Sequence, residues 1–192
     1  VDESLFAVTV RDDGSGTNKF FLEQFDKDLN MDFADEFNGS AGGFAVSSHF
    51  SNGAVVKVVS GTDYLGQFTV AGGNVDVSAV DASASSAFIG FAFTPTMKTL
   101  PVDGTVQNGP MTGKPRRITS VILDLEETLS VSVDGTDLII RNVNDDFSTA
   151  RTAISGKKEF FVLGFDRDPT VTVSQSAPMS LSLNGLVMEM TV

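Results

Sequence analysis

Seven Asn-Gly and Asp-Gly pairs punctuate this chain of 192 residues, and they constrain its fold more than any other feature. Both pairs favour tight turns with positive φ, whose twist matches that of paired antiparallel strands. The pairs begin at Asp13, Asn38, Asn52, Asp103, Asn108, Asp134 and Asn184. Because the segments between them are short and rich in β-branched residues, they are typical of strands. The sequence therefore predicts an all-β protein, an antiparallel β-sandwich plus a small β-barrel-like subdomain, with little or no helix.

The strongest strand signal follows Arg116, in the segment RRITSVILDLEETLSVSVDG. Near the N-terminus, Phe6, Val8 and Val10 alternate onto one face, which is typical of a half-buried strand. We expect strands at residues 5–12, 19–25, 44–50, 54–59, 67–70, 74–78, 87–93, 117–125, 129–133, 138–142, 159–165, 170–175 and 181–192. An exposed, mobile loop is expected at residues 143–158, which are polar and interrupted by glycine.

Residues 22–37 leave two alternatives open. Their apolar residues recur three or four positions apart with acidic residues between them, as on one face of a helix. These residues are Leu22, Phe25, Leu29, Phe33 and Phe37. The first alternative is a short helix at residues 26–33. The second is a strand through Phe25 followed by an irregular acidic loop.

Glycine and proline set the expected domain boundaries. A glycine-rich break follows residue 38, and prolines are frequent between residues 94 and 115. We expect residues 1–40 to join residues 113–192 in a β-sandwich unit, because strand 5–10 has too few partners before Gly42. Residues 41–102 would form a small β-barrel or sandwich unit, and residues 103–112 a linker.

Composition excludes several classes of protein. The net charge of −12 repels phosphate, so sequence-specific binding of nucleic acid is not expected. The chain has 16 Phe but one Tyr and no Trp, which counts against a carbohydrate-binding module and favours Phe in the core or in subunit contacts. It has no Cys, so neither disulfides nor thiolate metal sites form. Its apolar stretches are short, so no membrane span is expected.

Candidate metal sites fail on spacing. Counting from Asp12, Glu23 falls at the last position of an EF-hand register, but Gly14 and Gly16 occupy positions that need side-chain oxygens. We therefore interpret this segment as a hairpin turn. Residues 142–146 alternate oxygen-bearing side chains but lack the glycine and the closing glutamate of such a loop. No metal ligand is predicted.

Candidate catalytic and phosphate sites fail on context. Residues 109–114 resemble a phosphate-binding loop, but Pro115 leads into a strand rather than a helix.

His49 stands alone at a strand end and is interpreted as structural. Arg116 and Arg117 could contact phosphate or pair with neighbouring carboxylates. The Asn38-Gly39-Ser40 sequon is interpreted as a turn. No pair of carboxylates is singled out by spacing for glycosidase chemistry. We predict no catalytic, cofactor-binding or metal-binding residue and no enzyme activity.

Three segments, in matching order, resemble the C-terminal part of the tail nozzle (tail tubular protein B) family of short-tailed phages. The first is ESLFAVTVRDDGSGTNKFFLEQFDKD, which is similar to that family's last β-propeller hairpin and carries Arg11 and Glu23 at the matching places. The second runs from HFSNGAVVKVVSG to IGFAFTPTMKTLP, and the third from KPRRITSVILDLEETLSVSVDG to SAPMSLSLNGLVMEM. Departures include Phe50 for Leu and Phe93 for Tyr. The family's propeller is otherwise missing, as in a piece beginning at that hairpin or a shorter relative.

The resemblance implies a structural virion protein, made in the host cytoplasm and located in the phage tail. It implies a homo-oligomeric ring, a hexamer in the full-length protein, that contacts other tail proteins and retains and conducts DNA without sequence-specific binding. It implies no cofactor. The alternative function is a soluble β-sandwich binding module of carbohydrate-binding or adhesin-like type, and a glycoside hydrolase is a third hypothesis.

Overall fold

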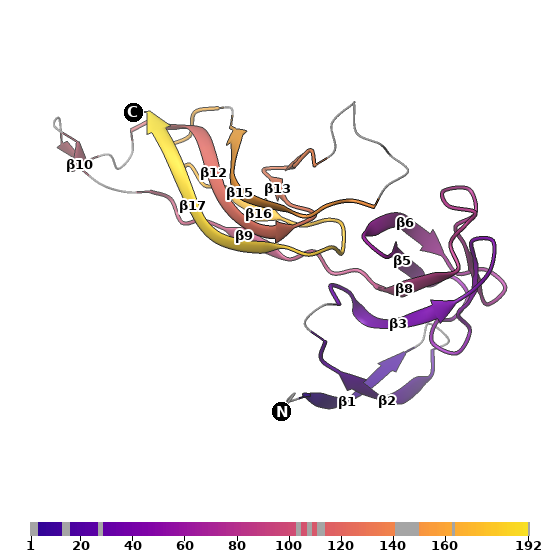
Figure 1. Cartoon of the computed structure of the whole chain (residues 1–192). Coiled ribbons are helices and arrows are strands. Elements are labelled where there is room, and N and C mark those ends of the chain that lie inside the picture. Colours follow the sequence, from indigo (N-terminus) through magenta and orange to yellow (C-terminus); the bar gives the residue numbers. More distant parts are fainter. Residues whose placement is uncertain are drawn as a thin grey trace. The chain divides into compact units, whose positions relative to one another are not determined.

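A computed structural model describes residues 4–12, 16–26, 29–102, 105–106, 109–110, 114–140, 150–162 and 164–191. These residues form antiparallel strands and, within those ranges, no helix, so the predicted all-β class is confirmed (Figure 1). The chain divides into two compact units. Unit 1 comprises Val1–Phe93 with Ala177–Met179, and unit 2 comprises Thr94–Ser176 with Ser180–Val192.

Unit 1 contains three antiparallel sheets. Its strands are β1 (Phe6–Asp12), β2 (Asn18–Gln24), β3 (Asp32–Asn38), β4 (Gly43–Ala45), β5 (Val55–Ser60), β6 (Asp63–Thr69), β7 (Asn74–Asp76) and β8 (Ser86–Phe91). The largest sheet has the order β3-β8-β5-β6, while β4 pairs with β7 and β1 with β2. The described strands close no barrel, so the barrel alternative for residues 41–102 is wrong and the sandwich-like one stands.

The core of unit 1 gathers the apolar side chains of the four-stranded sheet and of the turns around it. Val56 and Val58 of β5 are fully buried, as is Ile89 of β8. They pack with Phe37, Phe44, Val46, Phe50, Val70, Val75, Val77, Ala84 and Ala87. This burial stabilises the unit by roughly 1.5–3 kcal/mol for each large side chain.

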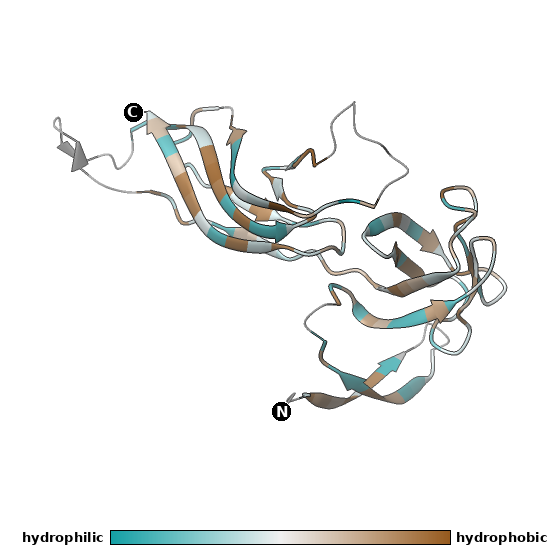
Figure 2. Cartoon of the chain, in the orientation of Figure 1, coloured by the Kyte–Doolittle hydropathy of each residue, from teal (hydrophilic) through white to brown (hydrophobic). Residues whose placement is uncertain are grey.

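Unit 2 is built around its longest strand. Its strands are β9 (Thr96–Lys98), β10 (Thr105–Val106), β11 (Gly109–Pro110), β12 (Arg117–Thr128), β13 (Ser132–Val133), β14 (Thr136–Asp137), β15 (Ile154–Phe161), β16 (Thr172–Ser174) and β17 (Ser182–Thr191). β12 lies between β15 and β17, a second sheet has the order β14-β13-β16-β9, and β10 pairs with β11. Apolar and polar residues alternate along β12 and β17 (Figure 2), and β12 buries Val121, Leu123 and Leu125.

The expected grouping of residues 1–40 with residues 113–192 is wrong. Among the described residues β1 pairs with β2 alone, and β3 is the edge strand of the four-stranded sheet of unit 1. The physical reason is Phe37 of β3, which is 7% exposed and belongs to the core of that sheet. The units divide between Phe93 and Thr94, just before Pro95, rather than at residues 103–112.

The helix alternative for residues 26–33 is also wrong in its described part, and a strand takes the place of the expected acidic loop after residue 31. A bulge between Asp32 and Asp35 interrupts the pairing of β3 with β8, and Phe33 has a φ of 52°. Bulges break the two-residue alternation of a strand. This irregularity explains why the apolar spacing imitates that of a helix.

Two further expectations change. The loop expected at residues 143–158 ends earlier, because β15 begins at Ile154, and residues 141–149 lie outside the described part. Strands were expected at residues 44–50 and 138–142, but β4 ends at Ala45 and β14 at Asp137.

In the described ranges, no helix has the length and apolar character needed to cross a membrane.

Candidate functional site

Arg11 of β1 is held by two carboxylates from different strands. Its Nε lies 2.6 Å from Oε1 of Glu23 on β2, and its Nη2 lies 2.8 Å from Oδ1 of Asp32 on β3. The hydrogen bonds that Arg11 donates to Glu23 and Asp32 raise its pKa. The hydrogen bond from Arg11 lowers the pKa of Glu23 below its usual range. The three side chains therefore fasten the β1–β2 hairpin to β3 by charge-assisted hydrogen bonds.

Phe33 is the aromatic centre of this region. The Arg11 guanidinium carbon lies 5.3 Å from the centroid of its ring, and the ring of Phe21 meets it edge-on at 4.6 Å. On its other sides Phe33 contacts the rings of Phe50 at 5.6 Å and Phe91 at 6.1 Å. A bulky residue at positive φ is strained and persists only where surrounding contacts hold it. Here those contacts are the three rings and the cation.

His49 connects the aromatic cluster to β3. Its Nε2 lies 3.1 Å from Oδ2 of Asp35, and its Nδ1 lies 2.8 Å from Oγ of Ser48. The order Ser48, His49, Asp35 has the connectivity of a hydrolase triad. In such triads the aspartate is buried, whereas the side chain of Asp35 is 55% exposed. The contacts are those of a structural histidine, and the expected lack of catalysis stays a prediction.

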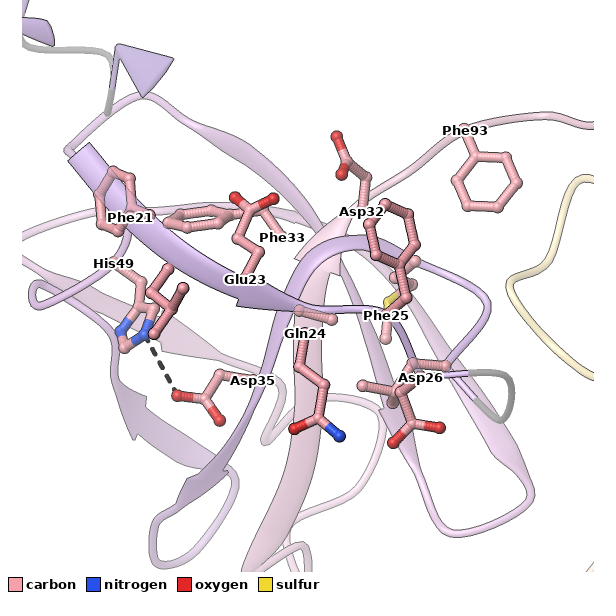
Figure 3. Close-up of a pocket in the computed structure, with 14 residues that line it drawn as sticks. Phe21, Glu23, Gln24, Phe25, Asp26, Asp32, Phe33, Asp35, His49 and Phe93 are labelled. Carbon is pink, nitrogen blue, oxygen red and sulfur yellow. Dashed lines mark ion pairs between the residues drawn. The ribbon is translucent and has the colours of Figure 1, made fainter. Parts of the chain in front are cut away.

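A groove of about 700 Å³ lies beside this cluster (Figure 3). Its lining comes from β2 and the residues just after it, from β3 and the residues just before it, and from two further side chains. The lining residues are Phe21, Leu22, Glu23, Gln24, Phe25, Asp26, Leu29, Met31, Asp32, Phe33, Ala34, Asp35, His49 and Phe93. Four of these residues are acidic and four are phenylalanines. None of the described lining residues is Lys or Arg. The groove is therefore both acidic and aromatic.

The hairpin has exposed apolar side chains on its other side. Its side chains alternate, so that Arg11, Phe21 and Glu23 face β3 while the intervening apolar residues face outward. The outward apolar residues are Phe6 (54% exposed), Val8 (71%), Val10 (54%), Phe20 (78%) and Leu22 (72%). These five residues form the hairpin face. The strand was expected to be half-buried through the face that carries Phe6, Val8 and Val10; that face is exposed, and the more polar face of β1 packs against the rest of unit 1 instead.

Arg116, a candidate phosphate contact, is a structural residue of unit 2. It is 1% exposed, and its guanidinium donates hydrogen bonds to the carbonyl oxygens of Val102 and Arg167. Its Nη2 also lies 3.4 Å from Oδ1 of Asp168. A buried arginine whose donors meet carbonyl oxygens has none to offer to phosphate at the surface. Arg117 lies over the ring of Phe165, with 5.9 Å between the guanidinium carbon and the ring centroid.

The other candidates are dispersed. Glu23, the last position of the EF-hand register, is paired with Arg11. Asn38 ends β3 and Ser40 forms a bridge with Gly43, so the turn lies at Ala41 and Gly42, just after the sequon that was interpreted as a turn. Residues 142–146 and 111–113 lie outside the described part. Within the described ranges, no three His, Asp or Glu side chains gather as they would to hold a metal ion.

The groove itself was not predicted from the sequence. Asp32, Phe33 and Asp35 fell in a segment interpreted as a helix or a loop. One signal points to the site in retrospect, because the resemblance had already singled out Arg11 and Glu23. No protein-family model matches the chain, and no curated protein matches it.

Proposed function

We propose that this chain is a structural, non-enzymatic virion protein, a component of a phage tail tube or nozzle that retains and conducts DNA. The observation that carries the proposal is the hairpin face, which leaves five large apolar side chains exposed on one side of one small sheet. Exposed apolar patches of this kind mark surfaces that other proteins cover. A subunit of an assembly needs such a surface.

A second exposed surface, on unit 2, suits the same role. Phe161 of β15 is 75% exposed and Val187 of β17 is 59% exposed. Both lie beside β12, where Phe161 pairs with Ser120 and Val187 with Ile122. Rings assemble through two different surfaces on each subunit that meet head to tail and close. The hairpin face and this second surface supply two such contacts in one chain.

The charge of the chain supports a conduit. With a net charge of −12, the protein repels the phosphates of DNA at long range. Binding to DNA depends on cations that neutralise phosphates, so an acidic wall lets DNA pass without retaining it. The virion location, the sixfold ring and the contacts with other tail proteins follow from the resemblance and are parts of the same proposal.

Light scattering and electron microscopy of the purified chain test the proposal, together with mass spectrometry of phage particles from its source. We expect concentration-dependent oligomers, ring-shaped particles and the protein in the virion. The double variant Phe20→Ser, Leu22→Ser should reduce assembly, while the control Val80→Ser, which alters an exposed apolar residue outside the hairpin, should not. A chain that stays monomeric and is absent from particles would refute the proposal. Micromolar binding on a glycan array would favour the carbohydrate-binding alternative.

A further inference from the structure

We propose that the groove between β2 and β3 accepts an extended, basic segment of a partner protein, which binds as an added β-strand. The inference goes beyond the tail assignment, because it rests on the groove and applies to any partner with this chemistry. Leu22 belongs to both the groove lining and the hairpin face, so Asp35→Asn, which changes a groove residue outside the hairpin face, is the variant that distinguishes the two surfaces.

Both described strands that line the groove have a free edge. In the described part of the chain, β2 pairs with β1 alone and β3 with β8 alone. Each strand therefore has one side whose backbone N–H and C=O groups pair with no other described strand. Free strand edges are templates for another chain, and an extended peptide can add to them as a further strand.

The lining places the edge of β2 at the groove. Side chains alternate between the two faces of a strand, so a pocket on a sheet face is lined by every second residue. Along β2, however, the groove is lined by four consecutive residues, Phe21 to Gln24, whose side chains lie on both faces of the hairpin. The run along β3 coincides with the bulge between Asp32 and Asp35. The groove therefore lies along the free edge of β2, and β3 contributes side chains to it.

The hydrogen-bonding phase of the hairpin identifies the free groups. The N–H of Phe25 donates to the carbonyl oxygen of Leu5 at 2.8 Å. In an antiparallel pair, hydrogen-bonded and non-hydrogen-bonded residue pairs alternate. Counting back from Phe25, the N–H and C=O of Leu22 and Gln24 point away from β1. Both residues line the groove, as an edge open to a new strand requires.

The side chains around the groove specify a cationic occupant. Glu23, Asp26, Asp32 and Asp35 line it, and no described lining residue is Lys or Arg. The chain already shows how this chemistry binds a guanidinium, since Arg11 meets two carboxylates and the face of Phe33. Asp35, which is 55% exposed and contacts His49, is placed to meet a second cation. A polyanion such as DNA is excluded by the same carboxylates.

The volume suits a short strand. About 700 Å³ lies within the range of roughly 300–1,000 Å³ that is usual for ligand sites. A strand advances about 3.3 Å per residue, so the lining segments of β2 and β3 match an occupant of about five residues. Alternate side chains of such a segment would meet the phenylalanines and the carboxylates.

Fluorescence anisotropy with labelled synthetic peptides tests the proposal on the full chain. The probe alternates valine and lysine. One control replaces lysine with glutamate, and another carries N-methyl groups on alternate backbone amides, which removes donors without changing charge. We expect the lysine peptide to bind at least about tenfold more tightly than either control. Equal binding of the methylated peptide would show charge attraction without an added strand, and equal binding of the glutamate peptide would refute the cationic specificity. Either result overturns the proposal, as does no binding.

Two proline variants locate the site. Leu22→Pro removes an outward N–H from β2 at the groove, and Val8→Pro removes one from the opposite edge of the same hairpin. Proline is tolerated at a strand edge whose N–H faces outward. We expect Leu22→Pro to weaken lysine-peptide binding about tenfold and Val8→Pro to leave it unchanged, with circular dichroism checking that both variants fold. If either variant unfolds, Asp35→Asn decides, with Asp137→Asn of unit 2 as its control. If the groove variant and its control weaken peptide binding equally, the assignment of the binding site to the groove is overturned.

Discussion

Nε of Arg11 lies 2.6 Å from Oε1 of Glu23, which joins the side chains of two neighbouring strands on the inner side of the hairpin. The same guanidinium reaches Asp32 on β3, so one side chain ties a two-stranded sheet to the rest of unit 1. Isolated two-stranded hairpins are marginally stable in water. The Arg11 contacts and the contact between Phe21 and Phe33 are therefore central to the position of the hairpin.

Replacing Arg11 tests this role. Arg11→Ala should lower the free energy of unfolding by about 1 kcal/mol, because the carboxylates are partly exposed and solvent screens the pairs. It should also speed hydrogen exchange in β1 and β2 more than in β5 and β8. Arg11→Lys should keep the charge but lose the two-pronged geometry, and so retain part of the protection. Lys98→Ala, on an exposed strand of unit 2, is the control and should change neither quantity.

The same ion pair predicts an acid-sensitive hairpin. Arg11 lowers the pKa of Glu23 from an ordinary value of 4.5, so the ionised form is favoured in the folded state. The resulting stabilisation is fully present above pH 4.5 and is lost as the pH falls through the lowered pKa. Hydrogen exchange of the hairpin measured from pH 6 to pH 3 should show this loss. Glu23→Gln should be less protected at pH 6 and should lack this part of the pH dependence. An identical profile in both proteins would contradict the prediction.

The buried guanidinium of Arg116 predicts a large effect in unit 2. Arg116→Met keeps the length of the side chain but leaves the carbonyl oxygens of Val102 and Arg167 without their donors. Unsatisfied buried groups cost about 1–3 kcal/mol each, so we expect a loss of about 2–4 kcal/mol in chemical denaturation. Lys157→Met, at an exposed position of β15, should change stability by less than about 0.5 kcal/mol. Similar losses in the two variants would contradict a structural role for Arg116.

Gly90 of β8 predicts a steric effect against β3. A Cβ atom added there would lie 2.8 Å from Cβ of Ala34 and 3.0 Å from the carbonyl oxygen of Asp32. Gly90→Ala should therefore displace β3 from β8 and cost about 1–3 kcal/mol. Gly185→Ala in β17 is a matched control, because its added Cβ would meet its nearest neighbour at an ordinary 3.9 Å. The midpoint temperature of thermal unfolding should fall for Gly90→Ala and stay unchanged for Gly185→Ala.

The alternation of apolar residues correctly predicted most strands. Of the turn pairs, those at Asn52 and Asp134 form turns as predicted, whereas Asn184-Gly185 lies inside β17. The segment after Arg116 became β12, and its Leu123 and Leu125 are buried as the pattern indicates. The prediction failed at β3, because the bulge at Phe33 depends on the rings and the cation that surround it. No local pattern reports these contacts, since their partners lie on β1, β2, β8 and the segment after β4.

The sequence by itself determined that this protein is an assembly of short antiparallel strands, because turn residues and apolar spacing act over a few neighbours. It also determined which face of each regular strand is apolar. Only the tertiary structure decided which faces are covered: the apolar face of β1 is exposed while its Arg11 face packs, and Arg116 is buried among carbonyl oxygens. Which face of a strand is buried depends on contacts with strands and loops far apart in the chain, and these contacts form only when the whole unit packs.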